Sequence, residues 1–111
     1  MKILRTKQNK ELDKKSLYRL LHSPVTKKIS EQRGQTLNIT EFCFFHDEEN
    51  DKDILSLLDK ENNVYATDSS TFQKAFIEIL DFFEEDEIIP VEVIGGVSKN
   101  GREFSTCSYA G

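Results

Sequence analysis

The sequence has few of the residues that build cross-linked, metal-bound or membrane-spanning proteins. Two cysteines, Cys43 and Cys107, are too few for a disulfide scaffold or for a structural zinc site on their own. No apolar run approaches the roughly 18–20 residues that a membrane-spanning helix needs. With 111 residues, the chain is long enough for one domain with its own core. We therefore expect a single domain over residues 1–111, with free thiols in a reducing cytoplasm and no membrane partner.

Histidine and glycine are also scarce, and their positions do not predict catalysis. His22 and His46 could be combined with the cysteines into a nucleophile–base pair or a zinc site, but they lack the ligand spacing and local signature of either. Gly95–Gly96 and Gly101 do not precede a helix, so they do not predict a phosphate-binding loop. The acidic run Asp47–Asp53 lacks the glycine and terminal glutamate of an EF-hand loop. We expect no enzymatic activity, no metal site and no cofactor.

The charges that are present divide the chain into two parts. Residues 1–33 contain ten Lys or Arg and three Asp or Glu, a formal charge of +7, whereas the remainder contains five and 17, a charge of −12. The formal net charge of -5 therefore does not exclude a polyanionic partner. Two alternatives stay open: the basic segment binds a polyanion, or the two parts pair with each other or with a neighbouring subunit.

Spacing of apolar residues predicts two helices. Leu12, Leu17, Leu20 and Leu21 predict a short N-terminal helix with a basic outer face, which ends before Pro24. The second helix follows the capping residues Asp68–Thr71 and carries one wide apolar stripe. The members of that stripe are Phe72, Ala75, Phe76, Ile79, Leu80 and Phe83.

Five strands are predicted around the second helix. The segments rich in β-branched and aromatic residues are Leu37–Phe45, Ile54–Leu58, Asn63–Thr67, Pro90–Ile94 and Glu103–Tyr109. Glu41 falls on an apolar face of the first strand, which predicts a bulge beside it if that face is the core. Asn100-Gly101 predicts a tight hairpin between the last two strands.

This order of elements favours a mainly β fold with additional α-helix. Five short strands with a helix between strands 3 and 4 is the element order of a five-stranded OB-fold-like barrel. The N-terminal helix, within the basic segment 1–33, would pack on it as an addition. An open α+β sheet is the main rival.

Aromatic and basic residues on the predicted strands favour the binding of single-stranded nucleic acid. Such proteins stack bases on aromatic rings and contact the phosphates with cations. The candidate cations near these strands are Lys27, Lys28, Arg33, Lys99 and Arg102. The candidate stacking residues are Phe44 (or Phe42), Tyr65, Phe104 and Tyr109, and the phenylalanines among them are more often core residues.

Three segments resemble a known family. They are Val64–Phe72, Pro90–Gly95 and the closing hairpin Ser98–Cys107, within a similarity over roughly residues 25–110. The chain is similar to small single-stranded-DNA-binding replication proteins, of OB-fold type, from short-genome podophages of Gram-positive bacteria. The resemblance implies binding and protection of displaced single strands in the host cytoplasm, with Tyr65, Lys99, Arg102 and Phe104 at or near the binding surface. The acidic loop Asp47–Asp53 would repel phosphate if it borders that surface.

Two functions of different classes therefore follow from the sequence. The first is sequence-nonspecific binding of single-stranded nucleic acid, DNA favoured, during phage DNA replication, with a host or replication protein as a further partner left open. The alternative is an acidic phage interaction module or inhibitor, which presents carboxylates as a mimic of DNA to a host DNA-associated protein. The sequence does not decide the oligomeric state.

Overall fold

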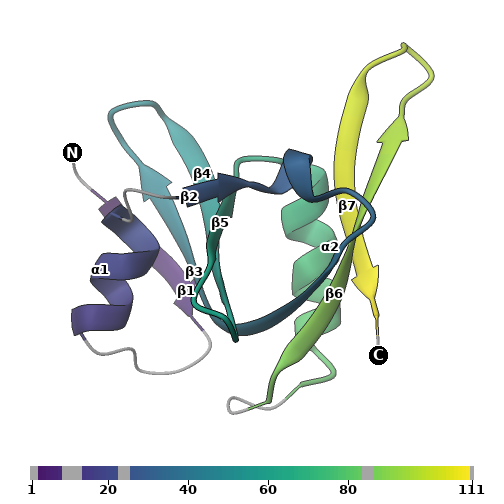
Figure 1. Cartoon of the computed structure of the whole chain (residues 1–111). Helices are drawn as coiled ribbons and strands as arrows, with labels where there is room; N and C mark the ends of the chain where they lie inside the picture. Colours follow the sequence, from purple (N-terminus) through teal and green to yellow (C-terminus); the bar gives the residue numbers. More distant parts are fainter. Residues whose placement is uncertain (1–2, 9–13, 23–25, 84–86, 111) are drawn as a thin grey trace.

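The computed structural model describes residues 3–8, 14–22, 26–83 and 87–110 (Figure 1). Its strands are β1 (Ile3–Gln8), β2 (Thr26–Lys28), β3 (Thr36–Asp47), β4 (Lys52–Asp59), β5 (Val64–Thr67), β6 (Ile89–Val97) and β7 (Glu103–Tyr109). Its helices are α1 (Lys14–His22) and α2 (Ser70–Leu80), and a 3-10 turn, η1, covers Ile29–Gln32. Leu12 and Pro24, on which the prediction of the first helix partly depended, lie outside the described residues. In the described part of the chain, no helix is long and apolar enough to cross a membrane.

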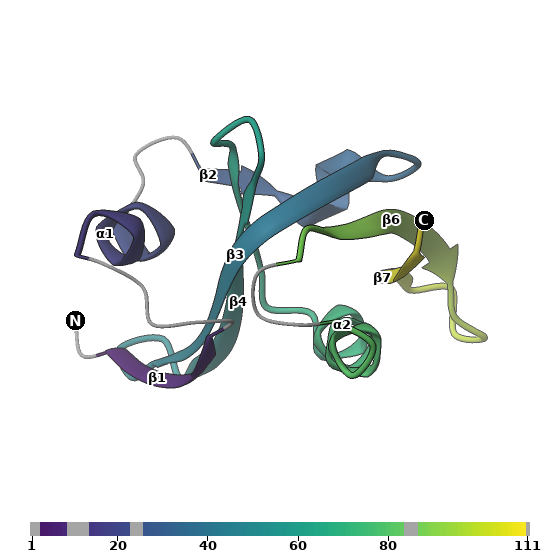
Figure 2. The same cartoon turned by 90° about the horizontal axis from the view of Figure 1, so that it is seen from below.

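The protein is mainly β, and its sheet curls strongly into the form of a half-barrel (Figures 1 and 2). Six strands lie in the order β2-β5-β4-β3-β6-β7, and β1 pairs with β3 beside this path. The long strand β3 pairs with β4 along one edge, and its other edge is shared by β6 near Leu37 and by β1 near Phe45. Among the described residues β5 and β7 do not pair, so the curl does not close into a barrel.

The predicted bulge in β3 is confirmed, and it decides which side chains face the core. The pairing of β3 with β4 shifts register between Ile39 and Glu41. After this shift Phe42 and Phe44 join Leu37 and Ile39 in the main core. Strict alternation along β3 would instead put the two phenylalanines on the face opposite Leu37 and Ile39. Cys43 and Phe45 instead belong to a second, smaller apolar cluster on the other face.

Helix α2 lies inside the curl and provides much of the main core (Figure 2). Phe72, Phe76 and Ile79 of the predicted stripe are buried, and each such side chain contributes roughly 1.5–3 kcal/mol. The Ser69 hydroxyl accepts a hydrogen bond from the Phe72 backbone N–H at 3.2 Å, as expected for an N-cap. The helix ends at Leu80, earlier than the stripe predicted, and Phe83 packs against the core from the following turn.

Helix α1 covers the opposite, outer face of the sheet. Leu20 is buried in the second cluster beside Phe45 and Leu58. The Ser56 hydroxyl of β4 donates a hydrogen bond to the Leu20 carbonyl at 2.7 Å. The N-terminal helix therefore adds a small second core on the outside of β3 and β4.

The segment from β2 to η1 fills part of the gap between β5 and β7. Strand β2 is parallel to β5, and Ile29 of η1 is buried in the main core. The backbone N–H of Gly34 donates to the Val93 carbonyl at 2.8 Å, and Val93 donates to Gln35 at 2.9 Å. Neither β1 nor β2 was among the five predicted strands.

Candidate nucleic-acid interface

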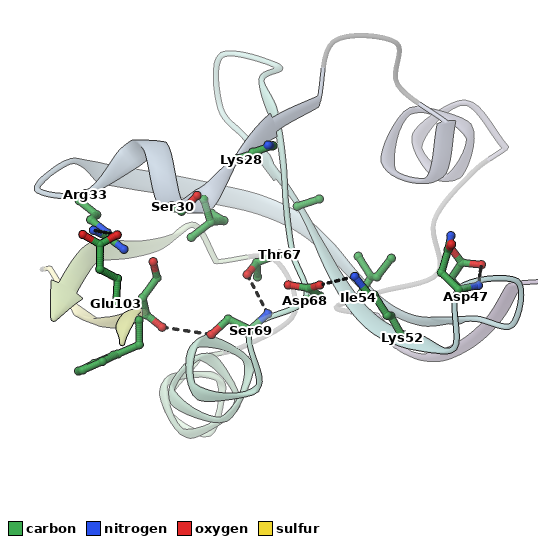
Figure 3. Close-up of a pocket in the computed structure, with 15 residues that line it drawn as sticks. Lys28, Ser30, Arg33, Asp47, Lys52, Ile54, Thr67, Asp68, Ser69 and Glu103 are labelled. Atoms are coloured by element: carbon green, nitrogen blue, oxygen red, sulfur yellow. Dashed lines mark hydrogen bonds and ion pairs between the residues drawn. The ribbon is translucent and has the colours of Figure 1, made fainter. Parts of the chain in front are cut away.

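A groove with a volume of about 840 Å³ opens between the two ends of the curled sheet (Figure 3). One end of the groove is formed by the β3–β4 loop and the other end by the start of β7. Ala66 and Thr67 of β5 lie between these ends, and β2 and η1 form one side. Because Ile54 and Ala66 line the groove, it begins on the outer face of the sheet, beside the area that α1 covers.

Charged residues of both signs line the groove. Its cations are Lys28, Arg33 and Lys52, and its carboxylates are Asp47, Asp68 and Glu103. Lys52 Nζ lies 3.2 Å from Asp68 Oδ2, and Arg33 Nη1 lies 3.7 Å from Glu103 Oε2 (Figure 3). Within the described residues Lys28 forms no ion pair. The groove therefore presents one uncompensated cation and two that are neutralised by neighbours.

Two consecutive glycines in β6 make room for groove side chains on opposite faces. A Cβ atom at Gly95 would collide with the Arg33 stem, approaching its Nε to 2.7 Å. A Cβ atom at Gly96 would collide with the Phe104 ring, approaching its Cε1 to 2.8 Å. Gly96 pairs directly with Phe104 across the β6–β7 hairpin, and the Phe104 side chain is 37% exposed. The Phe104 ring thus lies against the strand with part of its surface in solvent.

The end of the β6–β7 hairpin carries two exposed cations. Gly101 has a positive φ of 78°, and the turn is closed by hydrogen bonds from Ser98 N to Arg102 O and from Gly101 N to Ser98 O. This confirms the hairpin that Asn100-Gly101 predicted. Lys99 and Arg102 lie at this end, which extends away from the body (Figure 1). Glu103, the residue after Arg102, lines the groove.

Phe44 and Tyr65 are not available for base stacking, and both assignments are corrected. Phe44 is 6% exposed, with its ring 5.8 Å from that of Phe42. Tyr65 is 4% exposed, and its hydroxyl donates a hydrogen bond to Asp59 Oδ2 at 3.0 Å. Burial, together with this hydrogen bond, raises the pKa of Tyr65 to about 12. Both rings belong to the core. The bulge in β3 places Phe44 on the inner face of the strand, and Asp59 gives the Tyr65 hydroxyl a buried hydrogen-bond partner.

Two further candidates lie away from the groove. Lys27 lines a separate polar cavity of about 240 Å³, donates a hydrogen bond to Asn63 Oδ1 at 3.2 Å and lies 5.9 Å from the Tyr65 ring centroid. Tyr109 is 54% exposed, but it is at the far end of β7, with its ring 5.4 Å from that of Phe83. Of the nine predicted residues, the groove brings together Lys28, Arg33 and Phe104, and Lys99 and Arg102 lie at the adjoining hairpin end.

Sequence reasoning missed several residues of the groove. Lys52 stands inside an acidic run, so its charge was obscured by that of its neighbours. The sequence predicts Asp68 and Ser69 only as capping residues, although Ser69 also donates a hydrogen bond to the Ser105 carbonyl at 3.3 Å across the gap. In the sequence, Glu103 is only the first residue of a predicted strand. No local pattern in the sequence identifies these residues as neighbours of Arg33 and Lys52.

The acidic β3–β4 loop borders the groove and has an internal structure. Asp47 accepts hydrogen bonds from the Glu49 and Asn50 backbone and from the Asn50 side chain, the last of which lowers the pKa of Asp47. His46 Nδ1 lies 2.8 Å from Asp53 Oδ1, and its Nε2 lies 3.3 Å from Asp51 Oδ1. The hydrogen bond to Asp53 raises the pKa of His46 above 6.5. His46 therefore links the two sides of the loop through carboxylates.

The thiols of the chain are buried. Cys43 and Cys107 are both free, and burial raises the pKa of Cys107 to about 12. A thiol in this state is protonated and is a poor nucleophile. In the described ranges, no group of three or more His, Cys, Asp or Glu side chains could hold a metal ion. The side chain of His22 lies outside the described part.

Comparison with known proteins gives no relative. No protein-family model matches the sequence, no curated protein matches it, and no solved structure matches the fold. The functional assignment therefore depends on the geometry of the groove and on the chemistry of its residues.

Proposed function

We propose that this protein is a non-enzymatic, sequence-nonspecific binder of single-stranded nucleic acid, DNA favoured over RNA, that protects displaced strands during phage DNA replication. The order of strand pairing supports this function. Strand β3 pairs with β4 and β6, β4 pairs with β5, and β6 pairs with β7, with α2 between the third and fourth of these five strands. This pairing order is the one expected of an OB fold whose last contact, between β5 and β7, is left open, and it supports the assignment. The OB-fold assignment is part of the proposal.

The position of the groove is the observation that carries the proposal. In OB folds, the loops between strands 1 and 2 and between strands 4 and 5 flank the bound oligonucleotide. The corresponding segments here are the β3–β4 loop and the end of the β6–β7 hairpin. The groove extends from the first of them to residues Glu103–Ser105, directly beyond the second.

The groove and hairpin offer both kinds of contact that single strands require. Phosphates would bind Lys28, Arg33 and Lys52 in the groove and Lys99 and Arg102 on the hairpin. Phe104 would stack on one base, which is worth about 1–3 kcal/mol and does not depend on the identity of the base. Because α1 covers the outer face of β3 and β4, the strand would follow the groove instead of crossing that face.

The test is a titration of fluorescein-labelled oligothymidylate followed by anisotropy at several salt concentrations. Each phosphate contacted contributes about −0.7 to the slope of log affinity against log salt concentration, so five cations set a limit for this slope near −3.5. The double variant Lys99→Glu with Arg102→Glu should weaken binding and leave thermal stability nearly unchanged, since exposed charges contribute little to folding. Its control is Lys60→Glu with Lys74→Glu, which makes the same charge change at exposed positions outside the groove. Absence of binding at about 50 mM salt, or affinity that does not change with salt, would contradict the proposal.

The acidic β3–β4 loop favours a second candidate function, the binding of a basic host protein. Glu48, Glu49 and Asp51 are exposed at this end of the groove. An interaction module of this kind would ignore oligonucleotides and would capture a DNA-binding host protein even after nuclease treatment. The titration therefore separates the two functions.

A further inference from the structure

Both ion pairs of the groove join a cation to a carboxylate from a different element. Lys52, at the start of β4, reaches Asp68, and Arg33, directly after η1, reaches Glu103 at the start of β7. All four side chains keep solvent contact: Lys52 and Asp68 are each 57% exposed, Arg33 is 35% exposed and Glu103 is 74% exposed. Ion pairs of this exposure contribute little to folding. In the groove, these ion pairs therefore matter more for what can bind there than for folding.

Each cation is anchored by contacts that do not involve its carboxylate partner. The Arg33 stem lies against Gly95, and the backbone beside it is fixed to β6 by the hydrogen bond from Gly34 N to Val93 O. Lys52 is held at the start of β4 by the pairing of that strand with β3. Breaking either ion pair thus frees a charged group without moving the element that carries it.

The carboxylates are fixed in a similar way. Asp68 precedes Ser69, whose backbone N–H donates to Thr67 Oγ1 at 3.1 Å and whose hydroxyl caps α2. Glu103 pairs with Val97 in the β6–β7 ladder. Asp47, the third carboxylate of the groove, is instead occupied by the hydrogen bonds of the β3–β4 loop.

We infer that Asp68 and Glu103 are intramolecular competitors of the phosphate backbone. Each carboxylate occupies the cation that a phosphate would contact, so a bound strand must displace it and then lies beside its negative charge. The two residues would hold the affinity for nucleic acid below the limit that the cations allow, and would make release easier. This inference rests on the proposed function, because it concerns the same groove.

The test compares two double variants of the full-length chain with equal changes in net charge. Asp68→Asn with Glu103→Gln removes both competitors and keeps the shape of the side chains. Glu78→Gln with Glu92→Gln removes two exposed carboxylates that do not line the groove. The probe is fluorescein-labelled oligothymidylate of about 16 nucleotides, the upper site size of one OB fold.

We expect the groove variant to bind about three- to tenfold more tightly than the unmodified protein at low salt, with a smaller gain near 200 mM salt. The control variant should show less than about half of this gain, because its carboxylates act only at long range. Each single groove substitution should give part of the effect, so the inference stays testable if one variant does not fold.

The possible outcomes separate the inference from the proposed function. Equal tightening in both double variants would overturn the inference, because total charge alone would explain it. If the unmodified protein binds and the groove variant binds no better, only the inference fails. If neither the unmodified protein nor the groove variant binds, the proposed function fails and the inference fails with it.

Discussion

Substitution of Gly95 by alanine should remove Arg33 from the groove while leaving the fold in place. A Cβ atom at this position would collide with Cδ and Nε of Arg33, which are near the end of a flexible side chain. The side chain can therefore move aside, and the glycine-to-alanine change also reduces the entropy of the unfolded chain. We expect the free energy of unfolding to change by less than about 1 kcal/mol.

The effect on binding follows from the loss of one phosphate contact. The log–log salt slope should become less steep by about 0.7, and affinity at low salt should fall about fivefold, which corresponds to about 1 kcal/mol. Arg33→Ala should give the same change in slope. The assay is the anisotropy titration with labelled oligothymidylate, combined with urea unfolding of each variant.

Gly96→Ala provides the matched comparison, since Gly96 is the adjacent residue and its Cβ atom would collide with Phe104. Displacement of this ring should weaken binding by about 1–3 kcal/mol through lost stacking, with an unchanged salt slope. The reasoning is refuted if Gly95→Ala keeps the full slope while Arg33→Ala loses a contact. It is also refuted if both glycine variants change the slope equally.

Two further predictions concern the core and the acidic loop. Tyr65→Phe removes the hydrogen bond to Asp59, so it should lower the free energy of unfolding by about 1–2 kcal/mol. Oligonucleotide affinity should not change, and a loss of about fivefold would show that Tyr65 belongs to the binding surface. Asp53 raises the pKa of His46 above 6.5. The protonated His46 side chain therefore stabilises the folded state fully below pH 6.5, and this stabilisation is lost as the pH rises through the raised pKa. Urea midpoints measured from pH 6 upward should therefore fall in the unmodified protein relative to His46→Gln, and parallel curves would show that the loop contacts do not contribute to stability.

Several elements follow from local sequence signals. The stripe of Phe72, Phe76 and Ile79, together with the cap at Ser69, predicts α2, because both signals lie within the helix itself. The β6–β7 hairpin follows from Asn100-Gly101, and the bulge in β3 follows from one misplaced glutamate, Glu41.

Other features depend on contacts between distant residues, which local patterns do not contain. Strand β2 has only three residues, and its parallel pairing with β5 joins segments almost forty positions apart. Tyr65 is a candidate stacking residue in the sequence, but Asp59 provides a buried partner for its hydroxyl. The sums of +7 and −12 describe the two parts of the chain, yet they do not predict that Arg33 meets Glu103.

The most direct test of the proposed interface is an NMR titration of the ¹⁵N-labelled protein with unlabelled oligothymidylate. We predict changes in the backbone amide signals of Lys28, Arg33, Asp68 and Phe104 and along the hairpin end from Lys99 to Arg102. Signals of α1 and of the exposed side of α2 around Glu78 should stay unchanged. Changes confined to α1 or to α2, with the groove signals unaffected, would contradict the assignment of the groove as the nucleic-acid interface.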